Sequence, residues 1–184
     1  MLNEFTLATP VALPAQCSVT HVYQSVNLAD AYAIRLSSHA SSDPDLLARF
    51  LFAHQPWWAR TLMSVRDAIV ACVGLKTGKR LATLAKDAKA DRVGFFKVYS
   101  TSATEIVLWE DDKHLDFRLS VLCTRGPSLD SGHQLTVSTV VHCHNLLGRS
   151  YLFVIAPFHR MVIKAILRRA ARIGWPQAVA HSER

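Results

Sequence analysis

The fold is decided near the C-terminus by residues 145–172, NLLGRSYLFVIAPFHRMVIKAILRRAAR. Apolar residues recur there at steps of three and four, which is the period of a helix with one buried face. That face would carry Leu147, Tyr151, Ile155, Phe158, Val162 and Ile166. The opposite side would carry Arg149, Arg160, Lys164, Arg168 and Arg172. We predict one helix, roughly 40 Å long, that is capped by Asn145, ends at Gly174 and packs on a sheet.

The chain before this helix contains segments that alternate apolar and polar residues, which is the period of a strand. We predict five strands, at Asp30–Leu36, Val93–Tyr99, Glu105–Glu110, His114–Cys123 and Gln134–His144. After the first strand, Asp43 and Pro44 begin a helix that ends near Ala53, and a second helix follows through Val73. The predicted fold class is α+β: a curved antiparallel sheet that grips the long C-terminal helix, with two shorter helices between strands one and two.

Length and composition favour one globular domain. Half of the 184 residues are apolar and 19% are charged, so the chain can bury a sizeable core. We place the domain at residues 30–175, after an irregular segment, 1–29, and before a tail, 176–184. The excess of 21 Lys and Arg over 14 Asp and Glu gives a net charge of +7. That charge suits an anionic partner, but we favour a basic face that meets only water.

The location is predicted from cysteines and from hydropathy. Cys17, Cys72, Cys123 and Cys143 are widely spaced and form no C-x-x-C pair, which is typical of reduced, buried cysteines. We see no signal peptide and no apolar run long enough to span a bilayer. We therefore expect a soluble, cytoplasmic protein without a transmembrane segment.

Candidate catalytic residues lie in the segment EDDKHLDFRL, residues 110–119. The strand period places His114, Asp116 and Arg118 on one face and apolar residues on the other. One interpretation is a row that binds or polarises an anionic group. The alternative is an exposed ladder in which Asp116 and Arg118 pair with neighbours such as Lys97 or Gln134. We favour the ladder and expect Arg118→Ala to cost less than about 1 kcal/mol.

A metal site is not expected. His142 and His144 share one strand face while Cys143 points to the other, so a regular strand cannot direct all three at one ion. No metal-binding spacing accompanies them. His144 and Asn145 would instead cap the long helix.

Four motifs resemble a known family: DAYAIRL at 30–36, GLKTG at 74–78, EDDKHLDFRLSV at 110–121 and HNLLGRSYLFVIAPFHRMVI at 144–163. They are similar to a bacterial family called domain of unknown function 2867, over roughly residues 30–169. The resemblance implies a fold and brings no established activity. Members of that family also occur fused to short-chain-dehydrogenase-like domains, so such a domain is a possible partner; this chain has no G-x-G-x-x-G of its own. The order of elements is similar to the helix-grip arrangement of the START and Bet v 1-like superfamily.

The superfamily likeness implies a small-molecule binding protein. We expect an apolar or amphipathic ligand between the sheet and the long helix, and neither a cofactor nor nucleic acid. The walls would come from Phe96, Val98, Phe117, Leu119, Val137, Tyr151, Ile155 and Phe158, with Trp57 or Trp58 near the entrance. Two alternatives remain: a cyclase- or hydrolase-like acid–base catalyst that uses His114 and Asp116, and an interaction module whose basic helix face docks on an acidic partner or a membrane.

Overall fold

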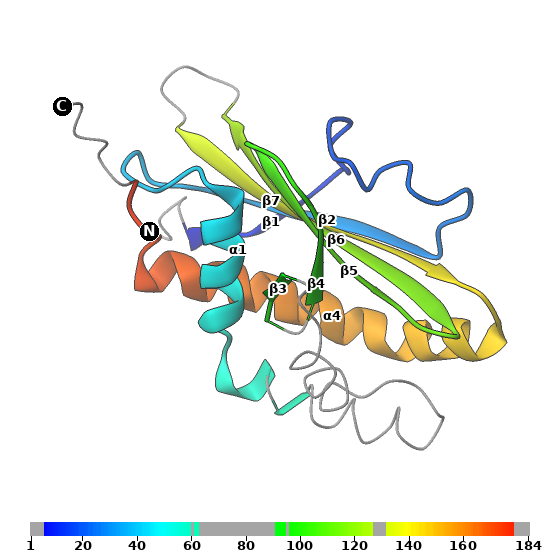
Figure 1. Cartoon of the computed structure of the whole chain (residues 1–184). Helices are drawn as coiled ribbons and strands as arrows, with labels where there is room; N and C mark the ends of the chain where they lie inside the picture. Colours follow the sequence, from blue (N-terminus) through cyan, green and yellow to red (C-terminus); the bar gives the residue numbers. More distant parts are fainter. Residues whose placement is uncertain (1–5, 60, 63–90, 95, 127–131, 179–184) are drawn as a thin grey trace.

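The structure is a computed structural model that describes residues 6–59, 61–62, 91–94, 96–126 and 132–178 (Figure 1). Its elements in chain order are β1 (Thr9–Val11), β2 (Leu28–Arg35), α1 (Pro44–Ala53), β3 (Arg92–Val93), β4 (Phe96–Thr101), β5 (Glu105–Asp111), β6 (Leu115–Arg125), β7 (His133–Cys143) and α4 (Leu146–Ile173). The predicted α+β class is confirmed. Of the predicted second helix, 57–59 and 61–62 are helical; the remainder, Cys72 and the GLKTG motif lie outside the described residues.

The strands form one antiparallel seven-stranded sheet in the order β1-β2-β7-β6-β5-β4-β3. The sheet has two more strands than the five that we predicted. A strand that we did not predict, β1, pairs with β2 within the segment that we took as irregular. The predicted strand Val93–Tyr99 is divided into β3 and β4 by Gly94, whose φ of +62° is readily adopted by glycine, as a tight reversal requires.

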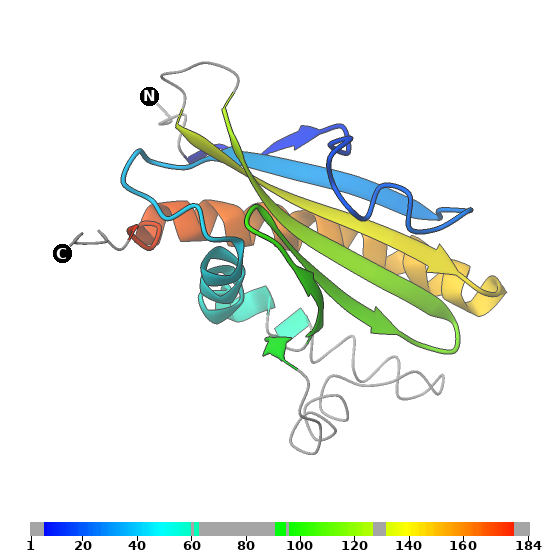
Figure 2. The same cartoon turned by 45° about the horizontal axis from the view of Figure 1, so that its top comes forward.

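The main core lies between one face of the sheet and the two helices. α4 runs along the sheet, and α1 crosses near the C-terminal end of α4 (Figure 2). The side chains that interlock there include Tyr32, Ile34, Leu119, Val121, Leu135 and Val137 from the strands, and Ile163, Ile166 and Leu167 from α4. α1 has the predicted limits, because Asp43 accepts hydrogen bonds from Asp45 N and Leu46 N and Pro44 occupies the first turn.

At three positions on α4, the buried residue is the one that follows the residue that we predicted. The buried residues of α4 are Gly148, Leu152, Ile163, Ile166, Leu167 and Ala170. Ile166 was predicted correctly, but Gly148, Leu152 and Ile163 each replace the residue that precedes them in our predicted face, which is a displacement of roughly 100° around the helix at those positions. Phe158 is correspondingly 46% exposed. Our prediction that Phe158 lies on the buried face was therefore wrong.

A close backbone approach explains this displacement. A Cβ atom on Gly148 would lie 2.1 Å from the carbonyl oxygen of His114, in the turn between β5 and β6. Only glycine lets the first turn of α4 approach that turn so closely. As predicted, Asn145 caps the helix: its side-chain oxygen accepts from Gly148 N at 3.0 Å.

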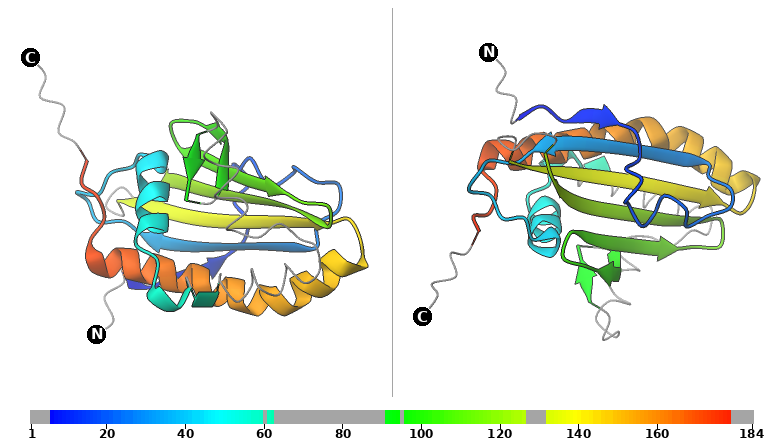
Figure 3. Two further views of the ribbon diagram at one scale, coloured as in Figure 1. Left: turned by 60° about the horizontal axis from the view of Figure 1, so that its bottom comes forward. Right: turned by 90° about the horizontal axis from the view of Figure 1, so that it is seen from above.

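The opposite face of the sheet, which we call its outer face, is also covered. The chain between β1 and β2 crosses this face while α4 lies behind the strands (Figure 3, right). Cys17 and Val19 of this segment pack against Val107, Leu122 and Val140 in a second apolar cluster. The buried carboxylate of Glu105 accepts hydrogen bonds from the Ser18 backbone and from the side chains of Cys17, Ser18 and Ser120.

By length and composition alone, α4 meets the requirement of a membrane-spanning helix, which our sequence analysis did not expect. Its residues Ile163, Ile166, Leu167 and Ala170 are nevertheless buried in the main core. α4 is therefore a helix packed on a sheet, and much of its other side is exposed.

Candidate functional site

The row predicted on β6 lies on the outer face of the sheet, turned away from α4. Leu119 and Val121 face α4 and pack in the main core, so the predicted alternation is confirmed. The expectation that Arg118 is exposed was wrong, because this residue is 9% exposed. The segment between β1 and β2 places Tyr23 over the guanidinium. Our prediction left this face of the sheet uncovered, so it did not include the burial of Arg118.

The guanidinium of Arg118 is enclosed by aromatic rings and one carboxylate. Its carbon lies 5.5 Å from the ring centroid of Tyr23, 5.7 Å from Tyr99 and 5.4 Å from Trp109. Both terminal nitrogens donate to Asp111, the Nη2–Oδ2 bond measuring 3.2 Å. The partner is therefore Asp111, and neither of the neighbours that we named. Asp111 neutralises the buried charge and the rings cover it, so the arrangement joins the N-terminal segment to the sheet, although the buried Nε of Arg118 has no hydrogen-bond partner among the described residues.

The histidines beside this cluster also have internal partners. His144 Nε2 lies 2.9 Å from Asp116 Oδ2, and this hydrogen bond raises the pKa of His144 above its usual 6.5. His142 contacts the carbonyl oxygen of Ser25 at 2.8 Å, and the Asn145 amide lies 2.9 Å from His114 Nδ1. Among the residues that the structure describes, no three His, Cys, Asp or Glu side chains form a group that could hold a metal ion.

The residues predicted to line a sheet–helix cavity are dispersed. Leu119 and Val137 are buried in the main core, and Phe96 and Phe117 stack against it with ring centroids 5.2 Å apart. Tyr151 and Ile155 are half-buried on α4. Phe158 and Trp57 are exposed. The sequence-predicted set therefore belongs partly to the packed interior and partly to the surface.

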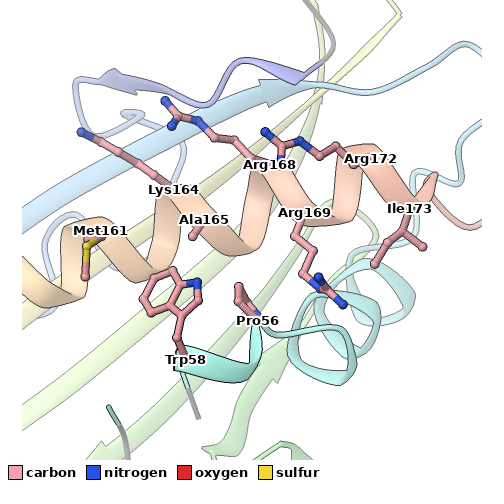
Figure 4. Close-up of a pocket in the computed structure, with 9 residues that line it drawn as sticks. All are labelled: Pro56, Trp58, Met161, Lys164, Ala165, Arg168, Arg169, Arg172 and Ile173. Atoms are coloured by element: carbon pink, nitrogen blue, oxygen red, sulfur yellow. The ribbon is translucent and has the colours of Figure 1, made fainter. Parts of the chain in front are cut away.

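A cleft of about 490 Å³ lies between the C-terminal half of α4 and the turn at Pro56 (Figure 4). Its lining residues are Pro56, Trp58, Met161, Lys164, Ala165, Arg168, Arg169, Arg172 and Ile173. The Trp58 ring lies under Met161 and Ala165, and Arg169 extends toward Pro56. Lys164, Arg168 and Arg172 leave the helix on its other side. We call this feature the α4 cleft.

All the charged residues that line the α4 cleft are cations. Four cations line it and no carboxylate does. Within the described ranges, none of these four cations forms an ion pair with an Asp or Glu; Lys164 instead lies 5.2 Å from the centroid of the Tyr32 ring. Lys164, Arg168 and Arg172 follow one another at steps of four, and such like-charge pairs cost roughly 0.2–0.5 kcal/mol each. The helix dipole near its C-terminus offsets part of this cost.

The sequence pointed to several residues of the α4 cleft, but it did not predict that they lie together. Trp58 was considered as an entrance residue, and the cations were assigned to a basic face. The missing information is spatial, since the turn at Pro56 is more than 100 residues from Met161 in the chain. No local period connects the two segments.

A family model described as "Protein of unknown function (DUF2867)" matches residues 22–166. The chain belongs to this family. The DUF2867 match includes the residues around Arg118, from Tyr23 to His144, and most of α4, and it ends before Arg168, Arg169 and Arg172. No curated protein and no solved structure matches the chain.

Proposed function

We propose that the protein binds a small amphipathic anion in the α4 cleft. The observation that carries this proposal is that Arg169 extends on the same side of α4 as the apolar wall of Pro56, Trp58 and Met161, with no carboxylate among the lining residues. Arg169 would hold the anionic group, because a guanidinium forms bidentate, charge-assisted hydrogen bonds with carboxylate or phosphate. The indole of Trp58 and the side chain of Met161 would contact the apolar part of the ligand.

The size of the α4 cleft supports a small ligand. Its volume of about 490 Å³ falls within the range of roughly 300–1,000 Å³ that small-molecule sites occupy. This proposal keeps the ligand class expected from the sequence but places the ligand outside the sheet–helix interface. Leu119 and Val137, which we expected to line a cavity there, are instead closely packed.

We further propose that the fold is a member of the helix-grip class, like the START and Bet v 1-like proteins. The support is architectural: seven antiparallel strands form one sheet, and the long C-terminal helix packs across one face. A likeness of this kind concerns the fold, and the function is argued from the α4 cleft alone.

The binding proposal is tested by calorimetric titration with two ligands that share a ten-carbon chain, decanoate and decyltrimethylammonium, each below its critical micelle concentration. We expect saturable binding of decanoate alone. Arg169→Ala should weaken it by about tenfold, since a hydrogen bond to a charged group contributes roughly 1.5–3 kcal/mol.

The matched control is Arg149→Ala, an exposed arginine near the other end of the same helix. It removes the same charge about 30 Å away along the axis and should leave the affinity unchanged. Equal binding of both probes, or equal loss in both variants, would refute a specific anion site.

A further inference from the structure

One side of α4 is exposed and apolar over the first half of the helix. The large apolar side chains exposed there are Leu146, Leu147, Phe153, Val154, Phe158 and Met161, and Phe153 is 83% exposed. At 100° per residue these positions share one side of the helix, away from Gly148, Leu152 and Ile163, which face the sheet. We call this surface the apolar half of α4. Exposed apolar side chains that are contiguous, unlike single ones, mark contact surfaces in proteins.

The same side of α4 is cationic over the second half of the helix. Arg160 and Arg168 are exposed and Lys164 is partly exposed, and all three follow the direction of Phe153 around the axis. Arg160 contacts Asp30 at 3.4 Å through Nε; within the described part of the chain, Lys164 and Arg168 have no carboxylate partner. The exposed side of α4 therefore presents apolar and positively charged surfaces in succession.

We propose that this side of α4 docks on an anionic lipid bilayer. Phe153 and Phe158 enter the boundary between headgroups and acyl chains, while Lys164 and Arg168 meet the lipid phosphates. This division between apolar insertion and cationic contact is how interfacial helices bind membranes. The helix lies on the bilayer and does not cross it, because Ile163, Ile166 and Leu167 hold its other side on the sheet.

Charge favours this occupant over a second copy of the chain. The protein carries a formal net charge of +7, so two copies repel each other as they approach. An anionic surface attracts that charge and also removes the apolar side chains from water. The inference does not rest on ligand binding in the α4 cleft: Phe153 and Phe158 do not line the cleft, whereas Met161, Lys164 and Arg168 belong to both surfaces.

The test is flotation of the full chain with two kinds of vesicle, phosphatidylcholine alone and phosphatidylcholine mixed with phosphatidylglycerol. We expect the protein to float with the mixed vesicles, to remain behind with the neutral ones, and to be released by high salt. Phe153→Ser should weaken vesicle binding by about tenfold, the loss expected when one large apolar side chain no longer inserts. Phe153 is so exposed that this variant should fold, which its thermal unfolding will verify.

The matched control is Leu46→Ser, which changes an exposed leucine on α1 and should leave vesicle binding unchanged. Arg169→Ala should keep vesicle binding while weakening decanoate binding by about tenfold, which separates the two proposals. Failure to float with mixed vesicles, or equal losses in Phe153→Ser and Leu46→Ser, would overturn membrane docking. Dimerisation in sedimentation experiments that Phe153→Ser abolishes would also overturn it, because the occupant would then be a second copy.

Discussion

Replacing Arg118 by methionine tests how the outer face of the sheet is held together. The substitution keeps an apolar stem of similar length and removes the charge that Asp111, Tyr23, Tyr99 and Trp109 surround. Hydrogen bonds to a charged group contribute about 1.5–3 kcal/mol. Cation–π contacts add roughly 0.5–1 kcal/mol when partly exposed. The Asp111 carboxylate is partly exposed and can regain water, so we expect a net loss of about 2–4 kcal/mol.

The assay is chemical denaturation followed by far-ultraviolet circular dichroism, with Arg125→Met as the control. Arg125 lies on the same strand and is exposed, so its replacement should change the free energy of unfolding by less than about 0.5 kcal/mol. Loss of the contact with Tyr23 should also increase proteolysis within the segment between β1 and β2. A loss below about 1 kcal/mol for Arg118→Met would refute the argument, because it would mean that water already surrounds the guanidinium.

Three further predictions concern α4 and its first turn. Leu167→Ala should reduce the free energy of unfolding by about 2–5 kcal/mol, whereas Phe158→Ala should cost less than about 1.5 kcal/mol; the reverse order in denaturant titrations would restore the face that we first predicted. Gly148→Ala should destabilise the fold despite the better helix propensity of alanine, because its Cβ would overlap a carbonyl oxygen; an unchanged melting temperature would contradict this. The bond to Asp116 raises the pKa of His144, so its stabilisation is complete below the unfolded pKa and is lost as pH rises through the folded pKa. The free energy of unfolding should therefore fall by at most about 1 kcal/mol between about pH 6 and pH 8, and His144→Gln should remove that slope; a slope that persists in the variant would assign it to another group.

The local signals in the sequence were sufficient to identify most of the elements. Asp43 followed by Pro44 determined where α1 begins, and Asn145 and Gly174 determined the ends of α4, because caps act through hydrogen bonds within a few residues. Alternation of period two located most of the strands, because the direction of side chains along a strand is also a local property. β1 was missed because a strand of three residues carries no detectable period.

Only the tertiary structure decided which surfaces these elements bury. Residues 146–158 are apolar on nearly every side, so periodicity could not choose a face for α4. The choice depends on the fit of Gly148 against the turn at His114, a contact between distant segments. Arg118 is buried because Tyr23 folds over it, and the α4 cleft forms because the turn at Pro56 meets Met161. A sequence pattern records the environment of one segment, whereas burial depends on which other segment arrives to cover it.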